Sequence, residues 1–396
     1  MTLPNLRLKR HEDRRLRQGH LWVFSNEVDT RATPLKRFEP GEAAVVEDAG
    51  GKALGIAYVN PNALICARLL SRDPRASVDR DFWLRRLQQA LAWRERLFPR
   101  PHYRLVHGEG DWLPGLVIDR FGDVCVAQLN TAGIERHRHD ILAALDRLLR
   151  PKTLVLRNDS PSRTLEGLAT EVEVIGAPVE HVTVEENGCR FLADPVHGQK
   201  TGWFFDHRDN RARAARLAKD GRVLDLFVYT GAWGIQLAAA GAKEVVCVDS
   251  SAAALALARE NARLNGVADR VAFVQADVFE HLKLLKQEKT RFDLVVADPP
   301  AFIKRRKDVA RGMEGYRRLN KLALARLGEG GILVSCSCSH HLEAARLQQL
   351  VSGAAGIART CALFARGGQA ADHPAHPAIP ETEYLKAQFY RVIPWP

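Results

Sequence analysis

The strongest hydrophobic pattern in the chain is a strand–helix–strand unit near its centre. An apolar run at 223–227 leads into a tight loop with Gly231, and an alanine-rich helical pattern then continues to Gly241. A second apolar run, 244–248, stops at an acid, Asp249. Two strands joined by a helix predict a parallel βαβ unit, and such sheets bind ligands at the carboxyl ends of their strands.

Further apolar runs extend the predicted sheet towards the end of the chain. A helical pattern at 251–264 is closed by Asn265-Gly266, which is a common stop signal. Three more strands are predicted at 271–276, 292–297 and 330–339. The first four strands end in the acids Asp225, Asp249, Asp277 and Asp298. Four acids at one edge of a parallel sheet describe a binding crevice.

Two other patterns lie before this sheet. Alternating apolar positions at 41–61 around a Gly50-Gly51 turn predict a hairpin of a small β-domain. Helical patterns at 79–98 and 135–150, together with short strands and an Asn187-Gly188 hairpin signal, predict a mixed region. We therefore predict an α/β protein with three domains: a small β-domain at 1–75, a middle α+β domain at 76–185 and a Rossmann-like domain at 186–396.

The loop after the first strand indicates which ligand fits the crevice. A dinucleotide site needs G-x-G-x-x-G so that the backbone can approach a pyrophosphate, but Phe227 and Tyr229 fill this region and only G-x-x-G remains. Asp225 would repel a pyrophosphate and suits the cationic S-adenosylmethionine (SAM), while Asp249 suits a ribose hydroxyl. Taken alone, the loop fits any α/β nucleotide fold. The expected cofactor residues are Asp225, Phe227, Tyr229, Thr230, Gly231, Asp249, Ser250, Asp277 and Asp298.

The segment 198–211 directly precedes the first strand of this unit. A glycine-containing entry leads to aromatic residues and then to Asp206 and Arg208. The segment can fold over the cofactor, which makes Asp206 and Arg208 further cofactor candidates. It can equally be a plain helix start, with an acid near the positive end of the helix dipole.

Composition limits the classes of function. The chain has 396 residues, of which 46% are hydrophobic and 27% charged, as in ordinary globular proteins of more than one domain. No apolar run suits a secretory signal or a membrane span, and the seven cysteines include no C-x-x-C pair. We therefore expect a cytoplasmic protein without a metal site, in which His107, Glu109 and Asp111 are ordinary loop residues. The net charge of +11 favours a polyanionic partner.

Basic side chains gather beside the predicted crevice. Asp298 opens a rigid Asp-Pro-Pro turn, and Phe302 follows it as a candidate for stacking on a base. The next four residues are typical of a grip on phosphates, with a solvated loop as the plain alternative: Lys304, Arg305, Arg306 and Lys307. Near the amino terminus, Arg14 and Arg15 precede two aromatic residues, a combination that can bind RNA.

Two cysteines lie at the end of the fifth predicted strand. Cys336 and Cys338 are two residues apart and therefore share a face, and Cys338 is closer to the carboxyl end and the crevice. Most cysteines are small buried hydrophobes, but a thiolate beside Asp298 suits methylation of a pyrimidine. It would add to carbon 6 so that carbon 5 can accept the methyl group. We assign catalysis to Cys338 and Asp298, with His340, His341 or the basic loop as candidates for lowering the pKa of the thiol.

Six motifs spread over nearly the whole chain are specific enough to compare with known families. They are RLRQGHLWVFSNEV, KTGWFFDHRDNR, LDLFVYTGAWG, ADPPAF, SCSCSHH and QAADHP…EYLK. Together they resemble the RlmI-type 5-methylcytosine methyltransferases of large-subunit ribosomal RNA. The resemblance implies an amino-terminal PUA domain, a class I methyltransferase domain, SAM as cofactor, a cytosine in 23S rRNA as substrate and Cys338 as nucleophile. The chain departs from the family at His207, where the family has Gln, and at Cys336.

Two other functions stay open on the sequence. An N-methyltransferase acting on a base amine would need the Asp-Pro-Pro-aromatic motif but not Cys338. A PUA-type RNA-binding protein with an inactive methyltransferase fold would bind RNA without turnover, although the four strand-end acids argue against it. A homodimer is also open, and the sequence names neither the target nucleotide nor the base that removes the carbon-5 proton.

Overall fold

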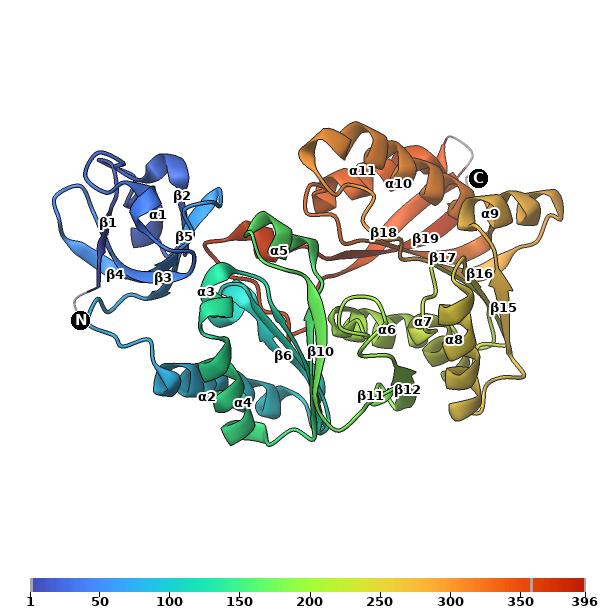
Figure 1. The fold of residues 1–396 in the computed structure, drawn as a ribbon. Helices are drawn as coiled ribbons and strands as arrows, with labels where there is room; N and C mark the ends of the chain where they lie inside the picture. The colour runs from blue at the N-terminus through green and yellow to red at the C-terminus, as the bar shows by residue number, and fades with distance from the viewer. Residues whose placement is uncertain (1–2, 357–358, 395–396) are drawn as a thin grey trace. The chain divides into compact units, whose positions relative to one another are not determined.

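The computed structural model describes residues 3–356 and 359–394, and the chain divides into two compact units. The first unit comprises 1–182, 194–203 and 371–382, and the second comprises 183–193, 204–370 and 383–396. The chain therefore passes between the units more than once. Each unit has its own sheets (Figure 1).

The amino-terminal part of the first unit is a five-stranded sheet in the order β1-β3-β4-β5-β2. Its elements are β1 (Asn5–Arg7), α1 (Arg14–Arg17), β2 (Trp22–Phe24), β3 (Glu42–Glu47), β4 (Ala53–Val59) and β5 (Ile65–Ser71). β3 and β4 pair antiparallel across a turn in which Gly51 has a φ of 85°, a conformation that glycine adopts without strain. The predicted hairpin is therefore confirmed. Leu6, Val23 and Leu69 are among the buried residues of this core.

The remaining sheet of the first unit has the order β10-β9-β8-β7-β6. The elements of this region are α2 (Arg80–Leu97), β6 (His102–His107), β7 (Leu116–Phe121), β8 (Val124–Leu129), α3 (Ala132–Arg136), α4 (Arg138–Leu149), β9 (Thr153–Asn158), α5 (Pro161–Leu165) and β10 (Glu171–Gly176). The Asp79 carboxylate caps α2 by accepting the Phe82 N–H at 2.9 Å. The helix predicted at 135–150 is two helices, because the backbone leaves helical geometry at His137. The buried residues of this region form one hydrophobic cluster, which Tyr58 and Leu70 of the first sheet join. The domain boundary at 75 therefore stays a prediction.

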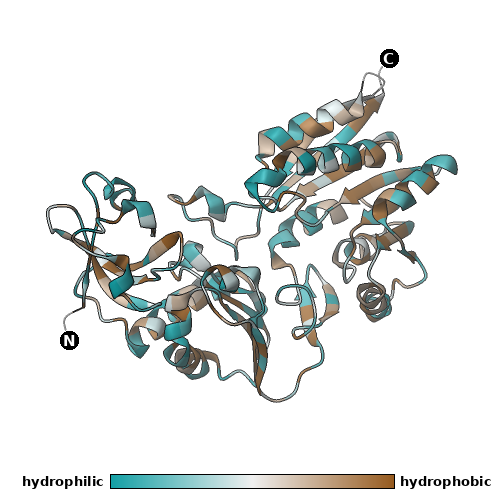
Figure 2. Cartoon of the chain, turned by 45° about the horizontal axis from the view of Figure 1, so that its top comes forward, coloured by the Kyte–Doolittle hydropathy of each residue, from teal (hydrophilic) through white to brown (hydrophobic). Residues whose placement is uncertain are grey.

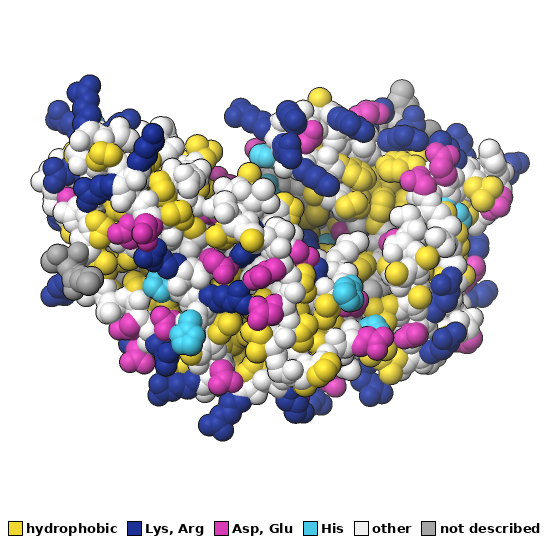
Figure 3. Space-filling model, viewed as in Figure 1, with side chains coloured by type: hydrophobic (Ala, Val, Ile, Leu, Met, Phe, Trp, Pro, Cys, Tyr) yellow, Lys and Arg dark blue, Asp and Glu magenta, His cyan; other side chains and the backbone are white. Residues whose placement is uncertain are grey.

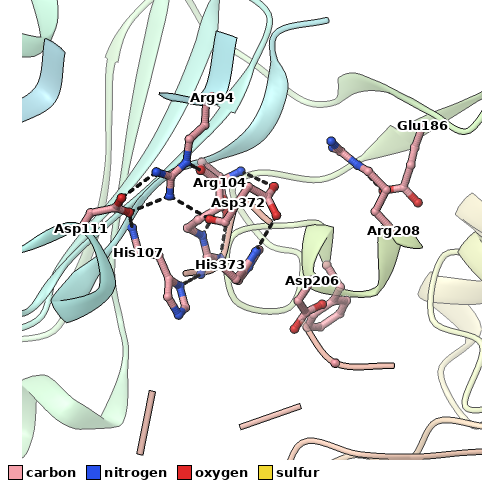
Figure 4. A network of polar contacts seen from close by, with 12 residues as sticks. Arg94, Arg104, His107, Asp111, Glu186, Asp206, Arg208, Asp372 and His373 are labelled. Carbon is pink, nitrogen blue, oxygen red and sulfur yellow. Dashed lines mark hydrogen bonds and ion pairs between the residues drawn. The ribbon is translucent and has the colours of Figure 1, made fainter. Parts of the chain in front are cut away.

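The last segment of the first unit is held by a buried ionic network (Figure 4). The Arg94 guanidinium is 0% exposed, donates to both carboxylate oxygens of Asp111 at 2.6 Å, and donates to the Asp372 carbonyl at 2.9 Å. The Asp372 carboxylate accepts the Arg104 N–H at 2.9 Å and lies 2.8 Å from His373 Nδ1. Removing one partner of a buried pair leaves an uncompensated charge, so this network anchors the segment to its unit.

The second unit is built on a seven-stranded sheet in the order β15-β14-β13-β16-β17-β19-β18. Its elements are β11 (Val182–Glu186), β12 (Cys189–Ala193), α6 (Arg208–Ala215), β13 (Arg222–Leu226), α7 (Ala232–Ala239), β14 (Glu244–Asp249), α8 (Ala252–Leu264), β15 (Val271–Gln275), α9 (Val278–Gln287), β16 (Phe292–Ala297), α10 (Val309–Leu324), β17 (Leu327–Ser337), α11 (Ala344–Ala355), β18 (Arg359–Gly367) and β19 (Lys386–Pro394). The pairs from β15 to β17 are parallel, and β19 runs antiparallel between β17 and β18. β11 and β12 form the hairpin predicted at Asn187-Gly188.

Helices cover both faces of this sheet. α9, α10 and α11 lie on one face and α6, α7 and α8 on the other (Figure 1). The strands are largely hydrophobic between helices of mixed character (Figure 2). Leu224 and Val295 of the strands pack in one buried cluster with Tyr316 of α10 and Leu347 of α11. A mostly parallel sheet covered by helices on both faces is the Rossmann-like architecture that the sequence predicted, so the fold class is confirmed.

Several strand ends differ from the sequence prediction by one to three residues, and β17 ends at Ser337, so that Cys338 lies outside the strand. β13 ends at Leu226, and Phe227 already lies in the loop with a φ of 64°. β17 begins at Leu327 rather than at 330, because pairing with β16 reaches back to Phe292. Pairing with neighbouring strands, and not local propensity, decides where β13 ends and where β17 begins.

Candidate active site

The loop after β13 has an unusual backbone. Phe227, Tyr229 and Gly231 have φ angles of 64°, 52° and 91°, all in the left-handed region. For the two non-glycine residues this conformation costs about 1 kcal/mol or more each. Asp249 holds the loop in place, because its carboxylate accepts the N–H of Tyr229 and the N–H of Ser251, both at 2.9 Å. The strand-end acid is therefore oriented beside the loop, as a ribose-binding carboxylate needs to be.

Asp225 lies behind this loop and is fully buried. One oxygen of its carboxylate accepts the Gly234 N–H at 2.8 Å, and a Cβ at Gly234 would lie 2.5 Å from Cys247 Sγ. Glycine is therefore required where the helix α7 approaches the strands. Burial, with a smaller effect of the nearby acids Asp298 and Asp249, raises the pKa of Asp225 to about 8, although the hydrogen bond from Gly234 lowers it.

Two buried polar atoms in this region suit a ligand with hydrogen-bond donors. The second oxygen of Asp225 and Oγ1 of Thr230 are buried and have no hydrogen-bond partner among the described residues. Buried polar groups in proteins are normally paired. A cationic ligand with an ammonium group fits these acceptors, so the residues present fit SAM.

Asp298 follows β16, and the ring nitrogens of Trp233 and His207 lie beside its carboxylate. Trp233 Nε1 donates to one oxygen of its carboxylate at 3.0 Å, and His207 Nε2 lies 3.2 Å from the other. Both rings are buried, whereas the carboxylate is 21% exposed. Asp298 can therefore accept further hydrogen bonds from a ligand while its orientation is fixed from behind.

The surroundings of His207 bear on metal binding. His207, Asp298 and Cys336 place their ligand atoms within 4.8 Å of one another. Asn210 Nδ2, however, donates to the Gly368 carbonyl at 2.8 Å and lies 3.2 Å from His207 Nδ1. An N–H group facing Nδ1 keeps the proton of a neutral imidazole on Nε2, the nitrogen that would bind a metal. This arrangement disfavours His207 Nε2 as a metal ligand, and the absence of a metal site stays a prediction.

The two cysteines of β17 have different environments. Cys336 is buried, and burial together with nearby Asp298 raises the pKa of its thiol well above the usual value. Cys338 lies just beyond the strand end and is partly exposed. The flanking hydroxyls of Ser337 and Ser339 both lie 2.9 Å from Tyr316 Oη, which fixes the backbone on either side of Cys338.

A buried lysine lies next to Cys338. Lys386 Nζ donates to the carbonyls of Ser339 at 2.6 Å and Tyr384 at 2.7 Å. Burial lowers the pKa of Lys386 to about 8, and the neighbouring Cys338 raises it. An ammonium beside a thiol favours the thiolate. His340 is exposed and its ring lies 5.7 Å from that of Tyr384.

The basic loop leads into α10. Lys304, Arg305, Arg306 and Lys307 are all exposed, and within 3–356 and 359–394 none of them forms an ion pair with a carboxylate. Phe302 is half-buried, with its ring 4.8 Å from Tyr316. Figure 3 shows Lys and Arg side chains gathered over α10 and α11, beside a hollow lined by hydrophobic side chains. This surface has the charge that an RNA backbone requires.

The remaining predicted cofactor and RNA residues lie at the positions described next. Asp277 is exposed and caps α9 by accepting the Glu280 N–H at 3.0 Å, and Ser250 is exposed after β14. Asp206 accepts the Tyr384 hydroxyl at 2.6 Å. Arg208 is buried, with Nε 3.6 Å from a carboxylate oxygen of Glu186. The amino-terminal candidates belong to the first unit, where Arg14 is exposed and Arg15 pairs with Glu27.

Sequence reasoning missed several residues of this site. Trp233, Asn210, Tyr316 and Lys386 orient the predicted residues, but each is a residue type that usually serves the core or the surface. The available signal was membership of a motif, since Asn210, Trp233 and Lys386 lie inside KTGWFFDHRDNR, LDLFVYTGAWG and EYLK, whereas Tyr316 lies in none of the motifs.

Two family models match the chain. One, described as an S-adenosylmethionine-dependent methyltransferase, matches residues 153–390, and the other, a PUA-like domain, matches residues 6–72. The prediction of SAM as cofactor is thereby confirmed. None of the described helices has the length and apolar content needed to cross a membrane.

The chain also has curated relatives over its whole length. A protein of Tolumonas auensis named ribosomal RNA large subunit methyltransferase I is 38% identical over 395 residues, which cover 98% of each chain. A protein of the same name from Escherichia coli K12 is 37% identical over 393 residues, again with 98% of each chain covered.

Solved structures share the fold. A methyltransferase complexed with SAH has a TM-score of 0.85 at 20% identity, covering 98% of this chain and all 100% of that one. A SAM-dependent methyltransferase from Streptococcus mutans has a TM-score of 0.83 at 19% identity, with the same coverage.

Proposed function

We propose that this chain, which belongs to the ribosomal RNA large subunit methyltransferase I family, methylates carbon 5 of a cytosine in large-subunit ribosomal RNA. The RNA substrate is inferred from the names of the relatives and from the PUA-like domain. The methyl donor is SAM, in keeping with the methyltransferase domain. Carbon-5 chemistry and a role for Cys338 are the further steps of this proposal.

The partly exposed thiol at the end of β17 is the observation that supports this chemistry most. Carbon 5 of cytosine is a poor nucleophile, and addition of a thiolate to carbon 6 makes it an enamine carbon that can attack an electrophile. Cys338 is partly exposed beside a buried ammonium, whereas Cys336 is buried with a thiol whose pKa is raised. Cys338 is therefore the better candidate for the nucleophile.

The reaction balances as addition followed by elimination. The Cys338 thiolate forms a bond to carbon 6, and the electron pair of the 5,6 double bond becomes available at carbon 5. Bound SAM would supply an electrophilic methyl group for that carbon, and the bond from the methyl group to the sulfonium sulfur would break to leave S-adenosylhomocysteine. A base then removes the carbon-5 proton, the double bond re-forms, and the carbon–sulfur bond breaks to release the thiolate.

Asp298 is proposed to hold the target base. Its carboxylate is partly exposed and already oriented by Trp233 and His207. A carboxylate accepts hydrogen bonds, and the 4-amino group of cytosine donates them. The exposed cations from Lys304 to Lys307 are proposed to bind RNA phosphates, with half-buried Phe302 next to them.

Methyl transfer from labelled SAM to in vitro transcribed large-subunit rRNA tests this function. We expect wild-type protein to produce 5-methylcytosine, Cys338→Ala to lose at least 10³-fold in rate, roughly as for loss of a nucleophile, and Cys336→Ala to stay within about 3-fold. Nucleoside analysis of the product identifies the methylated atom. Full activity of both variants, or a methyl group on a base amine, would favour an N-methyltransferase instead.

A further inference from the structure

Two ring nitrogens, one of Trp233 and one of His207, lie beside the Asp298 carboxylate and come from different elements. His207 lies at the start of α6 and Trp233 in the first turn of α7, and their rings are 5.2 Å apart. Each ring faces a different carboxylate oxygen, at 3.2 Å for His207 and 3.0 Å for Trp233. The two donors therefore restrict rotation of the carboxylate as well as its position.

The protonation of His207 follows from its other neighbour. Asn210 Nδ2 donates to the Gly368 carbonyl at 2.8 Å, which identifies this atom as the amide nitrogen. The same nitrogen lies 3.2 Å from His207 Nδ1, so Nδ1 accepts and Nε2 carries the proton towards Asp298. Asn210 thus selects the tautomer of His207 that donates to the carboxylate.

The carboxylate has capacity left for a ligand. An ionised carboxylate has about four acceptor sites; Trp233 Nε1 occupies one of them, and His207 Nε2 lies 3.2 Å from the other oxygen. Asp298 is 21% exposed while His207 is 5% exposed, so the remaining acceptor sites are the ones that a base can reach.

We propose that His207 and Trp233 are positioning residues that hold the Asp298 carboxylate as an acceptor for the amino group of the target base. This inference rests on the proposed function for the identity of that base as cytosine. Neither ring needs to contact RNA or SAM, because both act through Asp298. The property that matters at 207 is an N–H donor, which glutamine also provides and alanine does not.

Steady-state kinetics on in vitro transcribed large-subunit rRNA test the proposal. We expect His207→Ala to lower kcat/KM for RNA by about 10- to 100-fold, the loss typical of a hydrogen bond to a charged group, and His207→Gln to stay within about 3-fold of wild type. The Kd of SAM, measured by calorimetry, should change by less than about 2-fold in both. His281→Ala, which removes a half-buried histidine of α9, is the matched control and should behave as wild type.

A double-mutant cycle separates positioning from a general structural effect. In the Asp298→Asn background, His207→Ala should lower kcat/KM by less than about 2-fold, because the group through which it acts is already changed. Trp233→Phe keeps an aromatic ring but removes its N–H. If thermal melting shows that His207→Ala is unstable, Trp233→Phe takes its place, and we expect the same loss of kcat/KM from it.

Several results would overturn the proposal. Wild-type activity in both His207→Ala and Trp233→Phe would do so, as would a folded His207→Gln that is as slow as His207→Ala. Fully additive losses in the Asp298→Asn background would also contradict it. A product other than 5-methylcytosine would instead refute the proposed function. The relative kcat/KM values of wild type, His207→Gln and His207→Ala would still show whether the His207 ring positions Asp298.

Discussion

At the scale of single residues, buried groups determine how the exposed ones are presented. Asp249 is oriented by two backbone N–H groups, and Asp298 by the rings of His207 and Trp233. The sequence predicted both acids, because they end apolar strands. It could not predict their partners, since His207 and Trp233 reach Asp298 only through the packing of α6 and α7 against one another.

Asp225 leads to a prediction about pH. Its pKa is raised to about 8 by burial, so its carboxyl is mainly neutral at pH 6 to 7 and must release a proton to present a charge to a cationic cofactor. The affinity for SAM should therefore rise with pH up to about 8, by at most about 10-fold per unit. Titration calorimetry at several pH values measures this. Asp225→Asn removes the titrating group, so its affinity for SAM should change little with pH below 8. If the slope of log affinity against pH were the same for wild type and Asp225→Asn, Asp225 would not be the group that causes the pH dependence.

At the scale of elements, the periodicity of the sequence predicted the βαβ units well. The helix at 251–264 and the strands on either side appear within a few residues of their predicted ends. The differences arise where tertiary contacts decide, as at Phe227, which leaves β13 for a left-handed conformation, and at Leu327, which joins β17 by pairing with β16. Local propensity predicts neither the left-handed conformation of Phe227 nor the pairing of Leu327 with β16.

The basic loop before α10 provides a prediction for this scale. Lys304→Ala combined with Lys307→Ala should reduce the slope of log K against log salt for RNA binding by about 1.4 to 1.8, since each lost phosphate contact removes about 0.7 to 0.9. Lys286→Ala combined with Lys289→Ala removes the same charge from exposed positions around the end of α9. If that control pair lowered the slope equally, the effect would be one of net charge and not of a phosphate-binding loop.

At the scale of the whole molecule, the fold class was predictable and the path of the chain was not. The sequence predicted domains in linear order, with everything after 186 in one domain. Those bounds stay a prediction, and in the structure residues 194–203 and 371–382 group with the first compact unit. One reason is the network of Arg94, Asp111 and Asp372, since hydrogen bonds between residues as distant in sequence as Arg94 and Asp372 leave no periodic signal.

The central claim is a covalent bond between Cys338 and carbon 6 of the target cytosine. The most direct test is to incubate wild-type protein and SAM with large-subunit rRNA transcribed with 5-fluorocytidine triphosphate. Fluorine at carbon 5 cannot leave as a proton does, so the addition step proceeds and elimination is blocked. The account predicts a stable protein–RNA complex, with the nucleotide mapped to Cys338 by mass spectrometry after digestion. Methyl transfer without any adduct, or an adduct on Cys336, would contradict it.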